Sequence, residues 1–319
     1  MRLRVIGESE EAEESDTPSN LEKMLDTPGG KSNQDISFKA KTFRLQCDKG
    51  TLELSRRTHL MGVINVTPDS FYDGGRFFEP SRAVLRGVEL DRQGADIIDI
   101  GGESTRPGAA AVSVASELNR VIPVIEKLTR QVNALISIDT SKVEVARKAL
   151  VAGANIINDI SGLRFDPQLA QLAAESRVPL ILGHIQGRPG DMQNAPQYAS
   201  LMHDICSDLG YSIKLALEAG LSREQLVIDP GIGFGKTVQH NLLILKNLSS
   251  LRRLNLPVMV GPSRKSFLGK ISGLDAEERL EGTLAAAAVA IMNGAHLIRT
   301  HDVEQTKRLA TILDAIKAA

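Results

Sequence analysis

Short apolar runs alternate with amphipathic stretches from residue 59 to the end of the chain. Most runs are continuous, as expected of strands that are buried on both faces of a parallel sheet. The stretches between them place apolar residues at helical spacing, and several carry start or stop signals, such as Asp139-Thr140-Ser141 before one and Gly153 after it. We expect strands at 59–65, 95–101, 134–139, 154–159, 178–184, 225–230, 257–262 and 295–300, with helices at 80–92, 114–129, 142–152, 167–175, 201–218, 238–248, 276–292 and 303–316.

These eight β/α units follow one another in about 260 residues, and no obvious linker separates them. This order predicts an α/β protein with a single (β/α)8 TIM barrel in one domain, residues 42–319. A doubly wound open parallel sheet is the alternative that the same order of strands and helices allows.

The first forty residues differ in composition from the rest of the chain. Residues 8–16 are an acidic run, and turn-forming residues with few apolar ones surround it, so residues 1–41 are expected to be a disordered acidic tail. A regulatory or partner-binding arm is the other interpretation. Residues 42–54 alternate apolar and polar positions around Asp48-Lys49-Gly50, which predicts a β-hairpin over the bottom of the barrel.

The composition is that of a globular enzyme: 42% of the 319 residues are hydrophobic, 24% are charged, and the formal net charge is −1. This charge gives no reason to expect nucleic acid or an anionic membrane as a partner, and no apolar stretch approaches the ~20 residues that span a bilayer. Cys47 and Cys206 are far apart in the sequence, and no apolar targeting segment precedes the acidic run. These features favour a cytoplasmic location.

Polar or ionisable side chains follow every one of the eight expected strands. In a barrel of this kind the active site forms at the carboxyl ends of the strands. Each residue alone could simply cap the next helix, but that explanation does not suit the whole ring. The strand ends carry Asn65, residues 102–106, Asp139, Asn158, Asp159, His184, Asp229, residues 263–265 and residues 299–302.

Three basic residues come from the seventh and eighth strands: Lys265, Arg299 and His301. Barrels commonly bind a phosphate group at this place, and charge-assisted hydrogen bonds to it are strong. Asn65 follows the first strand, which neighbours the eighth once the barrel closes, and its amide oxygen could add a ligand for Mg²⁺.

Two carboxylates and an amide face these basic groups across the expected barrel: Asp139, Asp229 and Asn158. A carboxylate deep in a barrel needs a partner, and adjacent N–H donors of a heterocycle would bind one with two hydrogen bonds. The ring of residues therefore suits a flat heterocycle that carries a phosphate or diphosphate. No His/Cys cluster has the spacing of a structural zinc site, and the scattered histidines allow no Ser/His/Asp triad.

Two glycine-containing loops, 66–77 and 101–109, are expected to act as lids over the barrel mouth, with ordinary surface loops as the alternative. Residues 230–237 (PGIGFGKT) approach a phosphate-binding loop but have Pro230 where that motif needs glycine, and Lys236 stands where the dinucleotide fingerprint needs its third glycine. We expect a turn whose backbone approaches a ligand.

These residues lie in runs that resemble the dihydropteroate synthase family, the sulfonamide targets of the folate pathway. The runs cover the chain from about Phe43 to its end, in order and one per strand end. They are MGVINVTPDSFYDGG (61–75), GADIIDIGGESTRPGA (94–109), ISIDT (136–140), INDISG (157–162), HIQGRPGDMQ (184–193), IDPGIGFGK (228–236), SRKSFLG (263–269) and GAHLIRTHDV (294–303).

The resemblance implies that 4-aminobenzoate displaces diphosphate from 6-hydroxymethyl-7,8-dihydropterin diphosphate to give 7,8-dihydropteroate. It implies a dissociative substitution at the pterin methylene, with Mg²⁺ as cofactor, these two small-molecule substrates as partners and a homodimer formed through helices of the outer ring. The residue roles that it implies are Asp139, Asn158, Asp229, Phe234 and Lys265 for the pterin, Asn65, Arg299 and His301 for the diphosphate, Asn65 for Mg²⁺, Thr105, Arg106, Pro107 and Ser263 for the aminobenzoate, and Phe71, Asp73, Arg299 and His301 for catalysis.

One departure from the family pattern falls after the fifth strand. The family commonly reads Met-His-Met there, whereas this chain reads Gly183-His184-Ile185. Ile185 can replace a methionine by volume, but Gly183 is expected to leave space in the pocket wall. Two other functions stay open: a pterin-binding module that serves methyl transfer to a corrinoid partner, which would have little use for SRKS (263–266) or RTHDV (299–303), and a non-catalytic partner subunit.

Overall fold

Eight parallel strands form the centre of the computed structural model, which describes residues 43–47, 50–67, 72–73, 77–78, 80–104 and 108–319. The expected tail, residues 1–41, lies outside this part of the chain. The strands are β3 (His59–Asn65), β6 (Ile97–Gly101), β7 (Leu135–Asp139), β8 (Ile156–Asp159), β9 (Leu180–Gly183), β10 (Leu226–Asp229), β11 (Met259–Val260) and β12 (Leu297–Thr300).

From β3 to β10 each of these strands pairs with the next one in the sequence, β11 pairs with β12, and β12 pairs with β3, so the order is β10-β9-β8-β7-β6-β3-β12-β11. A parallel bridge between Ile228 and Val258 joins the two ends of this order and closes the sheet. The closed ring confirms the TIM barrel and excludes the open doubly wound sheet.

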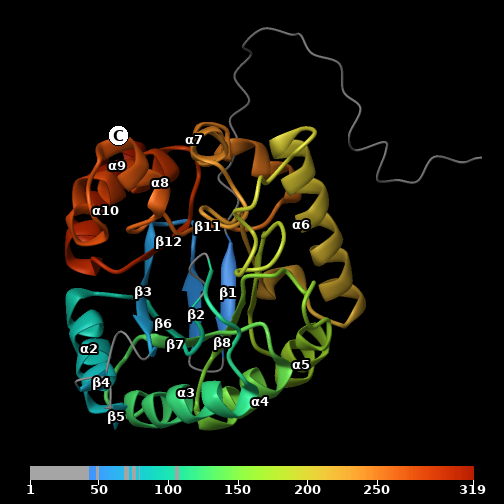
Figure 1. The fold of residues 1–319 in the computed structure, drawn as a ribbon, viewed down its shortest axis with the longest axis vertical. Helices are drawn as coiled ribbons and strands as arrows, with labels where there is room; N and C mark the ends of the chain where they lie inside the picture. The colour runs from blue at the N-terminus through green and yellow to red at the C-terminus, as the bar shows by residue number, and fades with distance from the viewer. Residues whose placement is uncertain (1–42, 48–49, 68–71, 74–76, 79, 105–107) are drawn as a thin grey trace, which may run out of the picture. The chain divides into compact units, whose positions relative to one another are not determined.

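Helices follow one another around the outside of the strands (Figure 1). The predicted helix 276–292 is divided into a 3-10 turn at Ala276–Glu278 and helix α9, and α8 stands outside the predicted set. Their bounds are α2 (Pro80–Gln93), α3 (Val114–Leu128), α4 (Val143–Ala152), α5 (Gln168–Ser176), α6 (Leu201–Glu218), α7 (Val238–Lys246), α8 (Ser266–Ser272), α9 (Leu280–Met292) and α10 (Val303–Ala318), with further 3-10 turns at Arg223–Gln225 and Leu248–Leu254.

The strands divide their side chains between two cores because successive residues of a strand point to opposite faces. On β6, Ile98 and Ile100 belong to the cluster that packs against the helices, while Ile97 belongs to a separate cluster inside the barrel. Asp99 stands two residues after Ile97 and therefore shares its inward face. The inner cluster fills only the amino-terminal end of the barrel, which leaves the other end to polar residues.

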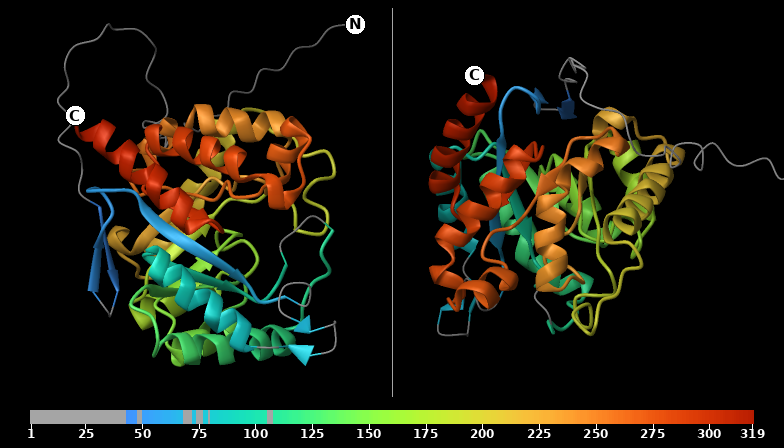
Figure 2. Two further views of the ribbon diagram at one scale, coloured as in Figure 1. Left: turned by 90° about the vertical axis from the view of Figure 1, so that its left-hand side faces the viewer. Right: turned by 90° about the horizontal axis from the view of Figure 1, so that it is seen from above.

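A two-stranded hairpin closes the amino-terminal end, as the alternation of residues 42–54 predicted. Its strands, β1 (Arg44–Cys47) and β2 (Gly50–Glu53), pair antiparallel, and Leu45, Cys47 and Leu54 join the inner cluster. A second pairing, between β4 (Tyr72–Asp73) and β5 (Phe77–Phe78), occurs in the first predicted lid loop. Figure 2 shows the two hairpins at opposite ends of the barrel.

Among the described residues, no helix has the length and apolar character required to cross a bilayer.

Candidate active site

A cavity of about 1120 Å³ opens at the carboxyl end of the strands. Six of the residues that the sequence singles out line it: Asn65, Phe234, Ser263, Lys265, Arg299 and His301. A smaller adjoining cavity shares Phe234, Lys265 and Arg299 with the first, and it adds Asn158 and Asp229. The two cavities therefore meet at a common wall.

Arg299 is held in that wall by two carboxylates. Its Nε donates to Asp99 Oδ2 at 2.7 Å, and its Nη2 donates to Asp139 Oδ2 at 2.7 Å. Burial raises the pKa of Asp139 to about 7, although the positive charge of Arg299 works in the opposite direction. Asp139 is not among the residues that line either cavity, so it meets the site through Arg299.

Asn158, Asp229 and Lys265 form the polar side of the smaller cavity. Asn158 Nδ2 donates to Asp99 Oδ2 at 3.0 Å, and Asp229 Oδ1 accepts from the backbone N–H of Gly231 at 2.7 Å. Burial raises the pKa of Asp229, and burial together with the charge of Arg299 lowers the pKa of Lys265 to about 8. The Lys265 Nζ also lies 3.8 Å from the ring centroid of Phe234, which fixes both side chains at the entrance.

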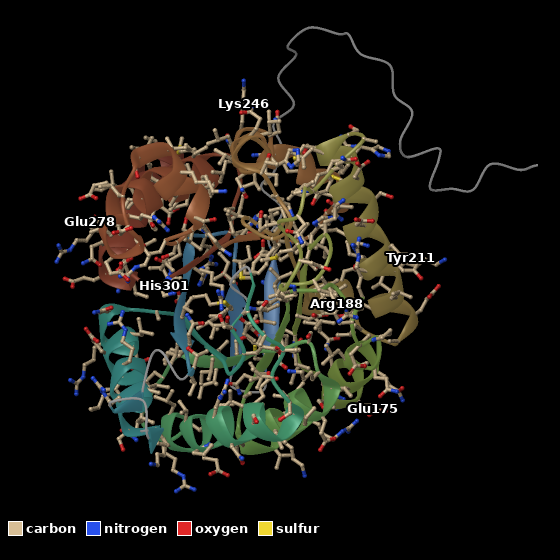
Figure 3. All side chains as sticks on the ribbon, viewed as in Figure 1. Glu175, Arg188, Tyr211, Lys246, Glu278 and His301 are labelled. Carbon is tan, nitrogen blue, oxygen red and sulfur yellow. The ribbon has the colours of Figure 1, made fainter. Side chains whose placement is uncertain are left out.

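His301 and its partners form the opposite side of the larger cavity. Its Nδ1 lies 2.9 Å from Ser263 Oγ, and its Nε2 lies 3.5 Å from Asn65 Nδ2. Burial and the charges of Arg299 and Arg264 lower the pKa of His301 to about 3. The ring is therefore neutral at pH 7, where the sequence alone indicated a basic group. Figure 3 shows His301 within the ring of helices, whereas Lys246 projects from α7 away from the strands.

The donor set suits Mg²⁺ only if a ligand of the cavity completes it. Among the described residues, no group of three or more His, Cys, Asp and Glu side chains could hold a metal ion. The Nδ2 of Asn65 is directed at His301, and among the described residues no donor binds its amide oxygen. Mg²⁺ commonly keeps few protein ligands and several substrate phosphate oxygens, and Asn65 fits that arrangement.

The second predicted lid loop is held at its base by a partly buried cluster of charged residues. Lys142 Nζ donates to Glu103 and to Glu117, Glu117 accepts from Thr140 Oγ1 at 2.7 Å, and Glu103 accepts from the N–H of Val112 at 3.0 Å. Glu117 is fully buried, and Lys142 is its ion-pair partner. Four predicted site residues of the two loops lie outside the described residues, and of Asp73 only the backbone in β4 is described: these four are Phe71, Thr105, Arg106 and Pro107.

The sequence missed two residues of the site. Asp99 follows two isoleucines inside an apolar run, and its only signal is a charged residue on the inward face of a buried strand. Ser266 starts α8 and lines the larger cavity, whereas Ser263, which the resemblance placed at the aminobenzoate, bonds to His301.

One expectation about a glycine is corrected. Gly183 leaves no space, because a Cβ there would meet the Cα and O of Ile160 at 2.7 Å. In the turn after β10, Gly231 has a φ of +70°, and its Cβ would lie 1.7 Å from the carbonyl oxygen of His184, so this position needs glycine. The turn also reaches the site, because Gly231 lines the smaller cavity and Gly233 lines the larger one.

The comparisons with known proteins agree with this geometry. A family model described as pterin binding enzyme matches residues 61–301. The dihydropteroate synthase of Synechocystis sp. is 46% identical over 262 residues, which cover 82% of this chain and 91% of that protein. The chain belongs to the dihydropteroate synthase family.

Two solved dihydropteroate synthases have the same fold. The enzyme of Xanthomonas albilineans with 4-aminobenzoic acid is 44% identical, with a TM-score of 0.81 over 88% of this chain and 100% of that one. The enzyme of Yersinia pestis in complex with a sulfonamide drug is 43% identical, with a TM-score of 0.82 over 86% of this chain and 100% of that one. The protein is therefore an enzyme of folate synthesis that condenses a pterin substrate with 4-aminobenzoate, and the methyltransferase-type module is set aside.

Proposed function

We propose that the two joined cavities divide the substrates of the dihydropteroate synthase reaction between them. The observation that carries the proposal is the position of Arg299 in the wall of both cavities. On one side of it lie Asn158 and Asp229, which suit a flat ring rich in N–H donors. On the other side lie Asn65 and His301, which suit the oxygens of a diphosphate.

The pterin ring would lie in the smaller cavity. Asp229 would accept hydrogen bonds from ring donors, Lys265 would donate to a ring acceptor, and Phe234 would pack against a ring face. Asp139 would act through Arg299, which it holds. Because the Lys265 ammonium group lies over the Phe234 ring, the two side chains would contact the ligand side by side.

The diphosphate would lie in the larger cavity, where Arg299 supplies a fixed positive charge and His301 a neutral ring nitrogen. In the reaction the C–O bond at the pterin methylene breaks and the diphosphate leaves with the electron pair. The electron-rich dihydropterin stabilises the resulting cation, and the amine nitrogen of 4-aminobenzoate uses its lone pair to form the C–N bond. The new ammonium passes a proton to water, so no strong general base is required.

Asn65 is the residue that would hold Mg²⁺, together with the diphosphate oxygens. When bound, this ion would neutralise charge on the leaving group. Preorganised positive charge at Arg299 serves the same purpose from the protein side.

The aminobenzoate would bind at the mouth of the larger cavity. The roles proposed for Phe71, Asp73, Thr105, Arg106 and Pro107 rest on the resemblance, and the bound 4-aminobenzoic acid of the Xanthomonas albilineans relative supports a site of this kind. Lys142, through Glu103, would keep the base of the second loop in place. Ser263 would support this region through His301.

A test of the function is the release of diphosphate from dihydropterin diphosphate and Mg²⁺, with and without 4-aminobenzoate. We expect release that increases with 4-aminobenzoate and yields dihydropteroate. Lys265→Ala should lower kcat/KM at least about 100-fold, because it removes a ring contact and a charge in the cavity wall. Lys246→Ala, which changes an exposed lysine of α7, is the matched control. Tight pterin binding without release would contradict the proposal and leave a non-catalytic relative.

We also propose a homodimer through helices α8, α9 and α10. Large apolar side chains of these neighbouring helices are between 44% and 62% exposed: Ile271, Val289, Met292, Ile312 and Ile316. Exposed apolar side chains that gather on neighbouring helices mark an interaction site. A second copy of the chain is the proposed occupant, because two-fold symmetry would bring the same helices of both copies together.

Sedimentation should show a dimer for the unmodified chain and a monomer for Val289→Glu combined with Met292→Glu. Val151→Glu, at an apolar residue of α4 that is 84% exposed, should leave the dimer intact. A monomeric unmodified chain would contradict this assignment.

Location in the cytoplasm also stays a proposal. The two cysteines, Cys47 and Cys206, are buried and are not joined in a disulfide, which agrees with a reducing compartment.

A further inference from the structure

Asp99 occupies the middle of β6 and is fully buried inside the barrel. One of its carboxylate oxygens, Oδ2, accepts two hydrogen bonds: from Arg299 Nε at 2.7 Å and from Asn158 Nδ2 at 3.0 Å. Arg299 lies on β12 and Asn158 on β8, and both strands are two places from β6 in the order of the sheet. One oxygen atom therefore connects the two sides of the barrel interior.

We propose that Asp99 is a positioning residue that couples the pterin cavity to the diphosphate cavity by fixing the Asn158 amide and the Arg299 guanidinium on one oxygen. The inference rests on the proposed function and deepens it. Asp99 lines neither cavity, so it acts through the two residues that it holds.

The first consequence concerns what Asn158 offers to a ligand. A side-chain amide can present either its oxygen or its nitrogen, depending on a rotation of the terminal group. Because Asn158 Nδ2 is bound to Asp99, its Oδ1 is the atom left for the cavity. Asp99 thereby makes Asn158 an acceptor that selects a ring N–H.

The second consequence concerns the direction of Arg299. The guanidinium is planar, so two anchoring bonds fix its plane. Asp99 binds Nε and Asp139 binds Nη2, which leaves Nη1 as the atom with no anchoring carboxylate among the described residues. With Asp139 as the sole anchor, the guanidinium could rotate away from the diphosphate.

Asp99 destabilises the folded protein, which supports a functional role for this residue. Its other oxygen, Oδ1, is buried without a hydrogen-bond partner among the described residues, and the same holds for Oγ of Ser137, its register partner on β7. A buried carboxylate with an unsatisfied oxygen destabilises a fold. Residues that break the rules of packing in this way concentrate at functional sites.

The test measures two unreactive ligands separately on the full chain: 6-hydroxymethylpterin, and pyrophosphate with Mg²⁺. Titration calorimetry should show that Asp99→Asn raises the dissociation constants of both ligands at least about tenfold. Asn158→Ala should weaken the binding of the pterin, and Arg299→Lys should weaken mainly the binding of pyrophosphate. In the double variant with Asp99→Asn, Asn158→Ala should cost little additional pterin affinity, because the two residues act as one unit.

The matched control is Asp96→Asn, which changes a half-buried carboxylate just before the same strand. Asp96 binds Arg57 and the N–H of Leu60 at the amino-terminal end of the barrel. This variant should lower the melting temperature and leave both dissociation constants within about twofold. If Asp99→Asn behaves in the same way, Asp99 is merely structural and the inference is wrong.

A second double variant keeps the inference testable if Asp99→Asn does not fold. Asn158 and Arg299 share Asp99 as a common hydrogen-bond partner. We expect the effects of Asn158→Ala and Arg299→Lys on pyrophosphate affinity to be non-additive by at least about threefold. Additive effects would overturn the coupling. An unmodified chain that binds neither ligand would instead refute the proposed function.

Discussion

Gly183 shows how one residue shapes the wall of the smaller cavity. Backbone atoms of Ile160 occupy the place that a Cβ would need, and they cannot move by a change of rotamer. Ile160 and Gly183 both line the smaller cavity. The close approach of these two backbones therefore shapes the pocket, where a relative with methionine would use a side chain.

Replacing this glycine should accordingly damage both stability and binding. We expect Gly183→Ala to lower the free energy of unfolding by about 1–3 kcal/mol, because overpacking displaces the backbone. The same variant should lower the affinity for 6-hydroxymethylpterin. Urea unfolding and calorimetry measure the two effects. Gly210→Ala is the control, since the nearest atom to its Cβ is 4.0 Å away and alanine favours a helix interior. Equal behaviour of the two variants would show that the Ile160 contact is unimportant.

The residues of the site differ in how far the sequence could reveal them. Arg299, Asn158 and Asp229 occupy the last two positions of their strands, and the barrel rule was enough to bring them together. Asp99 could not be found in that way because it stands within a strand, and its importance depends on which side chains meet it across the barrel. The neutral state of His301 was equally hidden, since burial and nearby arginines set it.

At the scale of elements, the pattern of apolar residues was sufficient for the eight strands and most of the helices. Continuous apolar runs have a clear physical cause when a strand is covered on both faces. The division of the predicted helix 276–292 was not readable, because it depends on a tertiary contact: Arg279, between the 3-10 turn and α9, donates to the backbone carbonyl oxygens of Leu274 and Arg264. Short helices such as α8 contain too few residues for the helical spacing of apolar residues to be recognised.

Asp96 joins the hairpin connection to the barrel and should make stability depend on pH. Burial alone would raise its pKa, but the His59 ring 3.4 Å away and the hydrogen bonds from Arg57 and the N–H of Leu60 lower the pKa well below its ordinary value. A carboxyl group with a lowered folded pKa stabilises the fold above its unfolded pKa, ~3.9, and that contribution is lost as pH falls below it. The stabilisation should therefore be complete above about pH 5.

We expect Asp96→Asn to lower the free energy of unfolding by about 2 kcal/mol at pH 7. The difference from the unmodified chain should shrink as the pH falls below about 5, because Asp96 of the unfolded chain becomes protonated near its ordinary pKa of ~3.9 while the folded carboxylate keeps its charge. Urea unfolding at several pH values measures it. Glu218→Gln, in an exposed pair with Lys214 on α6, should change stability by less than about 0.5 kcal/mol. A difference that is constant with pH would argue against the charge of Asp96.

For the whole molecule, the closure of the barrel is uneven. Every pair of neighbouring strands from β10 through β3 to β11 forms a ladder of backbone hydrogen bonds. Between β10 and the segment before β11, by contrast, there is the isolated bridge of Ile228 and Val258. Strand β11 itself has two residues, Met259 and Val260. Local opening takes place where few backbone hydrogen bonds hold a segment, so this junction is where the ring should part first.

Hydrogen exchange monitored by mass spectrometry tests this expectation. Peptides that contain Ile228, whose amide donates to Pro257 O at 3.0 Å, should exchange before those that contain Ile98, which lies in the middle of the sheet. Pyrophosphate and 6-hydroxymethylpterin together should slow the exchange at Ile228 at least about tenfold and leave the peptides of α4 unchanged. Uniform exchange of all eight strands would contradict an uneven closure.

The place of this junction gives it a further meaning. Asp229 ends β10 and Lys265 follows β11, so the two charged groups proposed to hold the pterin stand on opposite sides of the gap that the bridge spans. A ligand bound by both residues would connect β10 to β11 at the junction that has the fewest backbone hydrogen bonds. Substrate binding and the closure of the barrel would then be thermodynamically coupled. A protein molecule with pterin bound would open less often at this junction and would be cleaved more slowly by proteases.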